Sequence, residues 1–350
     1  MDRTQNRIIE GRYLQDILDQ PQALQATLDS LRADTSLFAR IAQLRRTPHA
    51  RIVLTGMGSS LHAQYPLELM LTAQGETVVR VDSSELIHSM PALLSSESII
   101  VAVSQSGQSA EIVKLLEMNN GRAKVIGVTN TAGSPLAVRS DVMLLTQCGD
   151  EYSVSAKTYV ATLAALEVLG AAWCGVAADD LYAELLQVPA MVSSYLKDWR
   201  EHVESLAAEM EGVTRLFIVG RGRSLAASAT GALTTKESTR TPAEGMSSAA
   251  FRHGPMEMSS PQTMVLVFEG QGEMSALNAK LVRDVHAWSG RSELIGPAAR
   301  VQAFRIPAMP ARLLPIVEIL PIQMMILAVA ANLGLEAGQF VHATKITSVE

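Results

Sequence analysis

The chain has 350 residues, of which 48% are hydrophobic, 18% charged and 4% aromatic, and its formal net charge is −6. This length suffices for two domains, and the apolar content excludes wholesale disorder. Because basic residues do not cluster with aromatic ones, the composition argues against nucleic-acid binding. A negatively charged protein does not attract an anionic substrate through its overall field, so local donors have to hold such a substrate.

Cys148 and Cys174 have the spacing of neither a metal site nor a disulfide framework, and both lie among apolar residues, as core thiols do. The chain begins with polar and charged residues rather than a signal-peptide pattern. Residues 313–333 form an apolar run of membrane-spanning length, but two prolines, a glutamate and a glutamine interrupt it, so we expect a buried helix. The sequence therefore predicts a soluble cytoplasmic protein without membrane segment, metal or cofactor.

Residues 8–46 have a helical pattern that breaks near Pro21. Five apolar, strand-like segments follow and alternate with helical ones, which is typical of a doubly wound parallel sheet. Residues 156–206 form a long helical region with interruptions near Gly175 and Pro189. The five predicted strands begin at Arg51, Thr77, Ile99, Lys124 and Val142.

The strand pattern then repeats. Residues 215–225 match residues 51–61 in their arginine, apolar strand, Gly-x-Gly turn, serine and leucine, and residues 264–272 correspond to 99–107. The offset of 164 residues, from Arg51 to Arg215, is too long for a solenoid and fits two similar domains. We therefore predict two doubly wound, flavodoxin-like parallel-sheet domains in tandem. The expected divisions are N-terminal helices at 1–46, a first domain at 47–195, a second at 196–340 and a tail at 341–350.

A hydroxyl-rich turn, Ser-Gln-Ser-Gly-Gln-Ser at residues 104–109, separates the strand at Ile99 from a helical segment. Backbone N–H groups and the helix dipole bind anions at such a place, and Gly107 lets the backbone approach closely. One serine would suffice for an N-cap, whereas three hydroxyls and a second serine-rich turn favour a phosphate monoester. No Walker lysine follows, so we expect a small metabolite rather than a nucleotide. The second copy has Glu269 at this place, so we expect only the first copy to bind phosphate.

These motifs resemble the sugar isomerase (SIS) family in its double-domain form, which includes the isomerase half of glucosamine-6-phosphate synthase. The resemblance rests on Leu-Asp-Gln-Pro at 18–21, the two serine-rich turns, the loop from Glu151, the segment 236–255 and the tail from Lys345. It implies phosphate binding by Ser60, Ser104, Gln105, Ser106 and Ser109, and sugar binding by Gly58, Ser59, Val154, Ser155, Ala156 and Lys236.

The same resemblance implies three catalytic residues. Glu237 corresponds to the base that moves a proton between C1 and C2, and its plainer interpretation is a helix-face partner of Arg240. His253 corresponds to the ring-opening histidine, which in the family reaches the site of a neighbouring subunit and so predicts a homodimer with shared sites. Lys345 corresponds to the tail lysine that forms an imine with the open-chain ketose, and its plainer interpretation is a solvated charge near a chain end.

The synthase begins with a glutaminase domain, whereas here Met1 leads directly into the isomerase part, so we expect ammonia release rather than transfer. The resemblance then implies a deaminase that converts glucosamine 6-phosphate and water into fructose 6-phosphate and ammonia. Two other enzymatic activities stay open: a deglycase acting on fructosamine- or glucoselysine-type 6-phosphates, and a galactosamine-6-phosphate deaminase or isomerase. A non-catalytic phosphosugar sensor is disfavoured, because such regulators usually place one SIS domain behind a helix-turn-helix.

Overall fold

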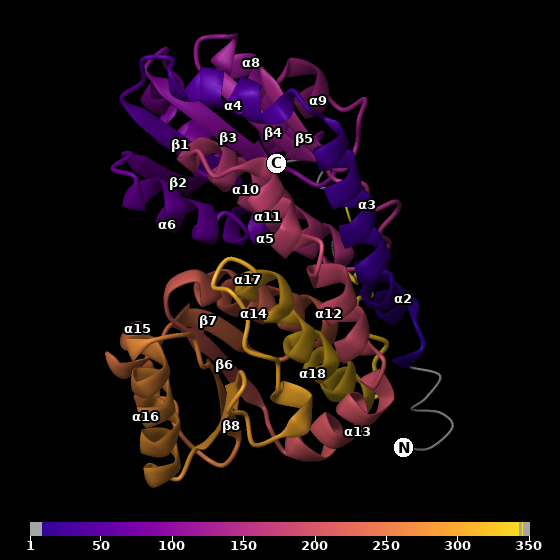
Figure 1. Ribbon diagram of the computed structural model, residues 1–350. Helices are drawn as coiled ribbons and strands as arrows, with labels where there is room; N and C mark the ends of the chain where they lie inside the picture. Colours follow the sequence, from indigo (N-terminus) through magenta and orange to yellow (C-terminus); the bar gives the residue numbers. More distant parts are fainter. Residues whose placement is uncertain (1–8, 343–344, 346–350) are drawn as a thin grey trace. The chain divides into compact units, whose positions relative to one another are not determined.

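The computed structural model describes residues 9–342 and Lys345 (Figure 1). Contacts between residues divide this part of the chain into two units, each built on one sheet. The first-sheet unit contains residues 20–151, 157–189 and Lys345. The second-sheet unit contains residues 9–19, 152–156 and 190–342. The units are thus discontinuous in sequence, and the chain passes from one to the other several times.

The first-sheet unit is built on a parallel sheet with the strand order β2-β1-β3-β4-β5 (Figure 1). Every residue of β3 is buried, because helices cover both faces of the sheet and its sequence is an apolar run after Ser98. The strands predicted from the sequence are confirmed. They are β1 (Arg51–Gly56), β2 (Val78–Asp82), β3 (Ser98–Val103), β4 (Lys124–Thr129) and β5 (Val142–Leu145).

Two helical layers cover this sheet. On one face, apolar residues of α7, α8 and α9 pack with Val53, Ile100 and Val125 in a single cluster. The other layer includes α3, α4 and α6, each of which contacts α10. The helices are α3 (Gln20–Ala33), α4 (Leu37–Arg45), α5 (Gly58–His62), α6 (Tyr65–Ala73), α7 (Ser83–His88), η1 (Pro91–Leu93), α8 (Ala110–Asn119), α9 (Pro135–Arg139), α10 (Lys157–Cys174) and α11 (Ala178–Leu185).

The second-sheet unit repeats the topology with the strand order β7-β6-β8-β9 (Figure 1). Its central strands β6 and β8 correspond to β1 and β3, so the predicted duplication and fold class are confirmed. Within the described residues, this sheet has no counterpart of β5. The strands are β6 (Arg215–Gly220), β7 (Ala243–Ser247), β8 (Thr263–Phe268) and β9 (Arg291–Ile295).

Helices also cover both faces of this sheet. Phe251 of α15 and Leu281 of α16 pack on one face with Phe217 and Val265, and α14 contacts β6 and β7. The helical elements are α2 (Arg12–Leu18), α12 (Val188–Leu196), which begins in the other unit, α13 (Trp199–Glu209), η2 (Gly222–Ser224), α14 (Leu225–Thr239), α15 (Ser248–Arg252), η3 (Pro255–Met258), α16 (Glu273–Ala287), η4 (Gln302–Phe304), α17 (Leu314–Val317) and α18 (Ile319–Asn332).

The long apolar run is the core helix of the second-sheet unit. Leu314–Asn332 has a mean hydropathy of 2.0 in its most apolar window and is the one helical stretch in the described part of the chain that is long and apolar enough to cross a membrane. That window is entirely buried, and α18 packs against α13 and α14. A helix that is apolar all round has to be buried, so the predicted buried helix is confirmed.

Candidate functional site

Two predicted phosphate-binding turns leave the same edge of the first sheet. Parallel pairing places Thr55 of β1 opposite Ala102 of β3, so the carboxyl ends of these strands are neighbours. The turn after β1 enters α5, which carries Gly58, Ser59 and Ser60, all of them half-buried. Gln64 fixes this helix, because its side-chain nitrogen donates to the carbonyl oxygens of Thr55 at 2.8 Å and Ser60 at 3.1 Å.

The turn after β3 is held by its own hydroxyls. Gly107 N–H donates to Ser104 Oγ at 3.1 Å, and Gln108 N–H donates to Ser106 Oγ at 3.3 Å. Ser104 and Ser106 are buried, and Gln105 is half-buried. Ser109 is the N-cap residue of α8, yet its side chain makes no capping hydrogen bond. A cap alone therefore does not account for the serine at this position, which leaves its hydroxyl for a ligand.

Gly107 is required by the geometry of this turn. Its φ is +64°, in the left-handed region that favours glycine, and an added Cβ would lie 2.1 Å from Ser134 Oγ. Thr129 Oγ1 donates to the carbonyl oxygen of Gln105 at 3.1 Å, which ties the turn to the end of β4. The turn is thus close-packed and is held by hydrogen bonds within itself and to β4.

In the second-sheet unit, the corresponding turns are occupied from within. Glu269, at the place of Ser104, accepts the backbone N–H of Ala298 at 2.9 Å and the hydroxyl of Ser275 at 3.2 Å. Ser224, at the place of Ser60, donates its hydroxyl to buried Glu318 at 2.7 Å. Burial raises the pKa of Glu318 to about 8, although the hydrogen bond from Ser224 acts in the opposite direction. Protein carboxyl groups therefore take the donors that a phosphate would need.

The two catalytic residues predicted in the segment 236–255 lie on different elements of the second-sheet unit. Glu237 is half-buried near the end of α14, beside exposed Lys236. It lies about 18 Å further along the helix than Leu225, at about 1.5 Å per residue. His253 is exposed and follows β7 and α15, past the edge of the sheet where α14 begins. Glu237 and His253 thus follow different strands of the second sheet, β6 and β7 respectively.

Lys345 lies in the first-sheet unit and is partly buried. Its ammonium group donates to Glu151 Oε2 at 2.5 Å, and the side-chain exposures are 25% for Lys345 and 0% for Glu151. Lys345 is therefore an ion-paired side chain rather than a solvated charge. Glu151 follows β5 and also accepts the backbone N–H of Thr158 at 3.0 Å and its hydroxyl at 2.7 Å.

Asn130 makes hydrogen bonds both to the turn after β3 and to the loop that leads to Glu151. Its backbone N–H donates to Gln105 O at 3.0 Å, and its side-chain oxygen accepts the N–H of Cys148 at 2.9 Å. Its side-chain nitrogen donates to Gly149 O at 2.8 Å, two residues before Glu151. The carboxyl edge of one sheet thus carries both the anion turn and the amine. Asn130 was not predicted as a site residue, although a polar residue directly after a buried strand is a signal for one.

The predicted sugar-covering residues belong to the second-sheet unit. Val154 and Ala156 are buried and Ser155 is half-buried. Asp16 of α2, itself buried, anchors the segment before them by accepting the N–H of Tyr152 at 3.2 Å and the hydroxyl of Ser153 at 2.9 Å. Asp16 lies more than a hundred residues earlier in the chain, so no local pattern identifies it as the anchor of this loop.

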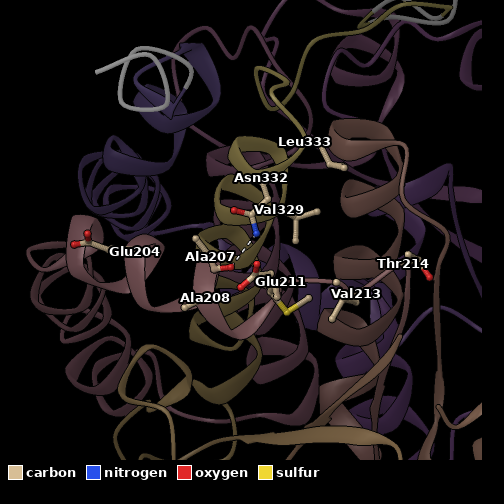
Figure 2. Close-up of a pocket in the computed structure, with 11 residues that line it drawn as sticks. Glu204, Ala207, Ala208, Glu211, Val213, Thr214, Val329, Asn332 and Leu333 are labelled. Carbon is tan, nitrogen blue, oxygen red and sulfur yellow. Dashed lines mark hydrogen bonds between the residues drawn. The ribbon is translucent and has the colours of Figure 1, made fainter. Parts of the chain in front are cut away.

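Two hollows of the second-sheet unit are lined by residues other than the predicted site residues. A cavity of about 610 Å³ lies between α13, the start of β6 and the end of α18, where Asn332 donates to the carbonyl oxygen of Ala207 (Figure 2). Glu204 and Glu211 give it acidic walls (Figure 2). A second hollow of about 530 Å³ lies beside Tyr195, His202 and Arg305. The first cavity is at the amino end of β6, opposite the edge where doubly wound sheets bind ligands.

The described ranges, 9–342 and Lys345, contain no group of three His, Cys, Asp or Glu side chains placed to hold a metal ion. Cys148 is buried, and burial raises the pKa of its thiol to about 12, while hydrogen bonds with Thr146 and Thr27 lower it. Cys174 is half-buried.

Two doubly wound parallel-sheet domains in tandem define an α/β protein. The sequence pattern of the SIS domain matches residues 46–172 and 209–333, so the chain belongs to the SIS family. The family resemblance inferred from the motifs is thereby confirmed.

The chain is similar to glutamine–fructose-6-phosphate aminotransferase (isomerizing) of Pyrococcus horikoshii, with 26% identity over 97% of this chain and 58% of that protein. It therefore spans little more than half of this relative. The C-terminal domain of glucosamine-fructose-6-phosphate aminotransferase from Francisella tularensis has a TM-score of 0.84 and 21% identity, covering 94% of this chain and 98% of that one. Glucosamine-6-phosphate deaminase from Thermotoga maritima has a TM-score of 0.79 and 16% identity, covering 97% and 100%. Because both identities are below 25%, these two similarities show only that the chain has the same fold as the two structures.

Proposed function

We propose that this chain is a phosphosugar isomerase that releases ammonia from glucosamine 6-phosphate and forms fructose 6-phosphate. The observation that carries the proposal is the carboxyl edge of the first sheet, which presents an anion turn and a lysine amine. A phosphosugar has an anion at C6 and reacts at C1 and C2, so it needs these two groups at a distance from each other. Ser109, whose hydroxyl makes no capping hydrogen bond, would hold the phosphate together with Ser60, Ser104, Gln105 and Ser106.

The proposed reaction is a sequence of proton transfers. His253 would open the sugar ring by moving a proton between the anomeric hydroxyl and the ring oxygen. Glu237 would remove the C2 proton and return it to C1, which turns the 2-amino aldose into a 2-imino ketose. Attack of the Lys345 amine on that imine carbon would release ammonia, and water would then hydrolyse the lysine imine to fructose 6-phosphate. The sum is one water consumed and one ammonia formed.

We further propose that His253 acts in the site of a second subunit, so that the enzyme is a homodimer with shared sites. The topology of the second-sheet unit supports this arrangement. Glu237 lies near the end of α14, whereas His253 follows the strand whose carboxyl end is near the start of α14. Gly245, in the middle of β7, is packed against the Ser228 backbone at the beginning of that helix. A single chain therefore presents these two groups at different ends of one domain.

Release of ammonia, rather than its transfer from glutamine, follows from the thiols. Hydrolysis of a glutamine amide by a cysteine needs a thiolate in a polar, accessible place. Cys148 is buried with a raised pKa, and Cys174 is the last residue of α10, whose other residues are all buried. Neither thiol fits that role, which supports water rather than glutamine as the second substrate of the proposed reaction.

An ammonia-release assay tests the proposal. The purified protein would be incubated with glucosamine 6-phosphate, and ammonia and fructose 6-phosphate would be measured by coupled assays. We expect both products in equal amounts from the wild type and neither from Glu237→Gln. Galactosamine 6-phosphate and fructoselysine 6-phosphate serve as parallel substrates. If either of these turns over faster than glucosamine 6-phosphate, the proposed substrate is wrong, and turnover in Glu237→Gln would remove that residue from the mechanism.

A further inference from the structure

We propose that Glu151 is the acid–base partner of Lys345, taking the proton from its ammonium group before imine formation and returning it to the leaving group. The inference rests on the proposed function, in which Lys345 forms an imine with the sugar. Its observation is the direct contact between Lys345 Nζ and Glu151 Oε2 at 2.5 Å. The carboxylate is fully buried, whereas the lysine side chain retains 25% of its exposure.

The carboxylate of Glu151 is held in one orientation. Oε1 accepts the backbone N–H of Thr158, and Oε2 accepts the hydroxyl of the same residue. Thr158 belongs to the first turn of α10, so the positive end of an 18-residue helix faces the carboxylate. Rotation of the carboxylate away from Lys345 would break both hydrogen bonds. Glu151 is therefore placed by the fold independently of the tail, and Lys345 comes to it.

An ammonium group has no lone pair and does not attack carbon, so a proton must leave Lys345 Nζ before a C–N bond forms. Oε2 of Glu151 is in hydrogen-bond contact with this nitrogen and is an oxygen base shielded from solvent. The direct contact between the two atoms makes Glu151 Oε2 the acceptor that the geometry supplies for this proton.

The same proton completes the later step. When the neutral amine attacks C2 of the imino ketose, the C–N bond to Lys345 forms and the original amino group becomes the leaving group. Protonated Glu151 supplies the proton with which this group departs as ammonia, and the carboxylate is restored. With fructose 6-phosphate the leaving group is the carbonyl oxygen, which departs as water. Atoms and charge balance in both directions without any further reactant.

Borohydride trapping with fructose 6-phosphate separates this role from a structural one. Borohydride reduces the imine on Lys345 to a stable secondary amine, which mass spectrometry of the Lys345 peptide detects. We expect wild type to form the adduct, Lys345→Met to form none, and Glu151→Gln to form it roughly 10²-fold more slowly. Glutamine keeps the shape and still accepts the Thr158 N–H but takes no proton, so the affinity for the phosphosugar should change little.

Two further variants control for displacement of the tail. Thr158→Val removes one hydrogen bond to Glu151 but leaves the carboxylate, so its trapping rate should stay within about tenfold of wild type. Glu151→Asp restores a carboxylate and should trap faster than Glu151→Gln. The inference is overturned if Glu151→Gln traps as fast as wild type, or if Asp gives no gain over Gln. Ammonia release without any wild-type adduct would overturn the inference and leave the deaminase proposal standing, whereas loss of both would overturn both.

Discussion

Replacing Gly107 with alanine tests whether the anion turn binds phosphate through its backbone. The new Cβ would lie 2.1 Å from Ser134 Oγ and 2.8 Å from Thr129 Oγ1, at a φ of +64°. The left-handed conformation costs alanine about 1–2 kcal/mol. Displacing Ser134, whose hydroxyl caps α9 by accepting the Ala137 N–H, costs about another 1 kcal/mol. The backbone of the turn therefore has to shift to relieve the collision and the unfavourable conformation.

A displaced turn loses donors to the phosphate. One hydrogen bond to a charged group is worth about 1.5–3 kcal/mol, so the loss of one weakens phosphosugar binding by roughly 10–150-fold. Isothermal titration calorimetry with a non-reacting phosphosugar measures this change, and the thermal midpoint reports stability separately. We expect Gly107→Ala to lower both the affinity and the midpoint.

Gly121→Ala is the matched control. Gly121 has a φ of +75°, and a Cβ added there meets no atom within 4 Å. This variant carries the conformational cost without the collision, so the midpoint should fall modestly and the affinity should not change. Adding Ser134→Gly to Gly107→Ala removes the nearest obstacle and should recover part of the affinity. Wild-type affinity in Gly107→Ala would refute the assignment of phosphate to this turn.

Three other predictions concern the remaining groups. Replacing Ser104 and Ser106 together with alanine should raise the Michaelis constant strongly, and an unchanged constant would place the phosphate elsewhere. Glu237→Gln should lose roughly 10²–10⁴-fold in turnover and should no longer exchange the C2 hydrogen of the sugar with deuterated solvent, while calorimetry should still detect phosphosugar binding. Hybrid dimers of Glu237→Gln and His253→Ala subunits should regain partial activity. Continued hydrogen exchange in Glu237→Gln, or inactive hybrid dimers, would contradict these roles. The folded-state pKa of Glu318 is raised from 4.5 to about 8, so its contribution to stability is complete below about pH 4.5 and is lost as the pH rises towards 8. Glu318→Gln still accepts the hydrogen bond from Ser224 but does not titrate. The free energy of unfolding in urea should therefore depend less on pH in this variant than in wild type over the same interval.

The sheets could be predicted from the sequence because their strands are buried on both faces. An unbroken apolar run such as that of β3 is a local signal, and so are the glycine- and serine-rich turns that follow such runs. The duplication was visible for the same reason, since equal turns recur at equal offsets from equal strands. The predicted fold class therefore agrees with the observed one strand by strand in the first sheet.

The contacts that complete the site are not local, and the sequence pattern contains no sign of them. Lys345 reaches Glu151 across 194 residues, and Asp16 reaches Ser153 across 137. A pattern along the chain also divides it into continuous segments, whereas the structural units take residues 152–156 and 9–19 together with 190–342. The helix boundary near Pro21 shows how closely a local pattern can place the end of a helix. Proline is tolerated in the first turn of a helix, so α3 begins at Gln20 and α2 ends at Leu18.

Because of Glu269, we expect only one of the two sheet domains to bind a phosphosugar. The Glu269 carboxylate is a covalently tethered competitor for the anion position of the second sheet, and tethering gives it an effective concentration of about millimolar or more. Free phosphate esters at lower concentrations do not displace it, and it adds a negative charge that repels them. A chain with two copies of the same domain should therefore bind one equivalent of phosphosugar, so the stoichiometry of a titration counts first-sheet units alone.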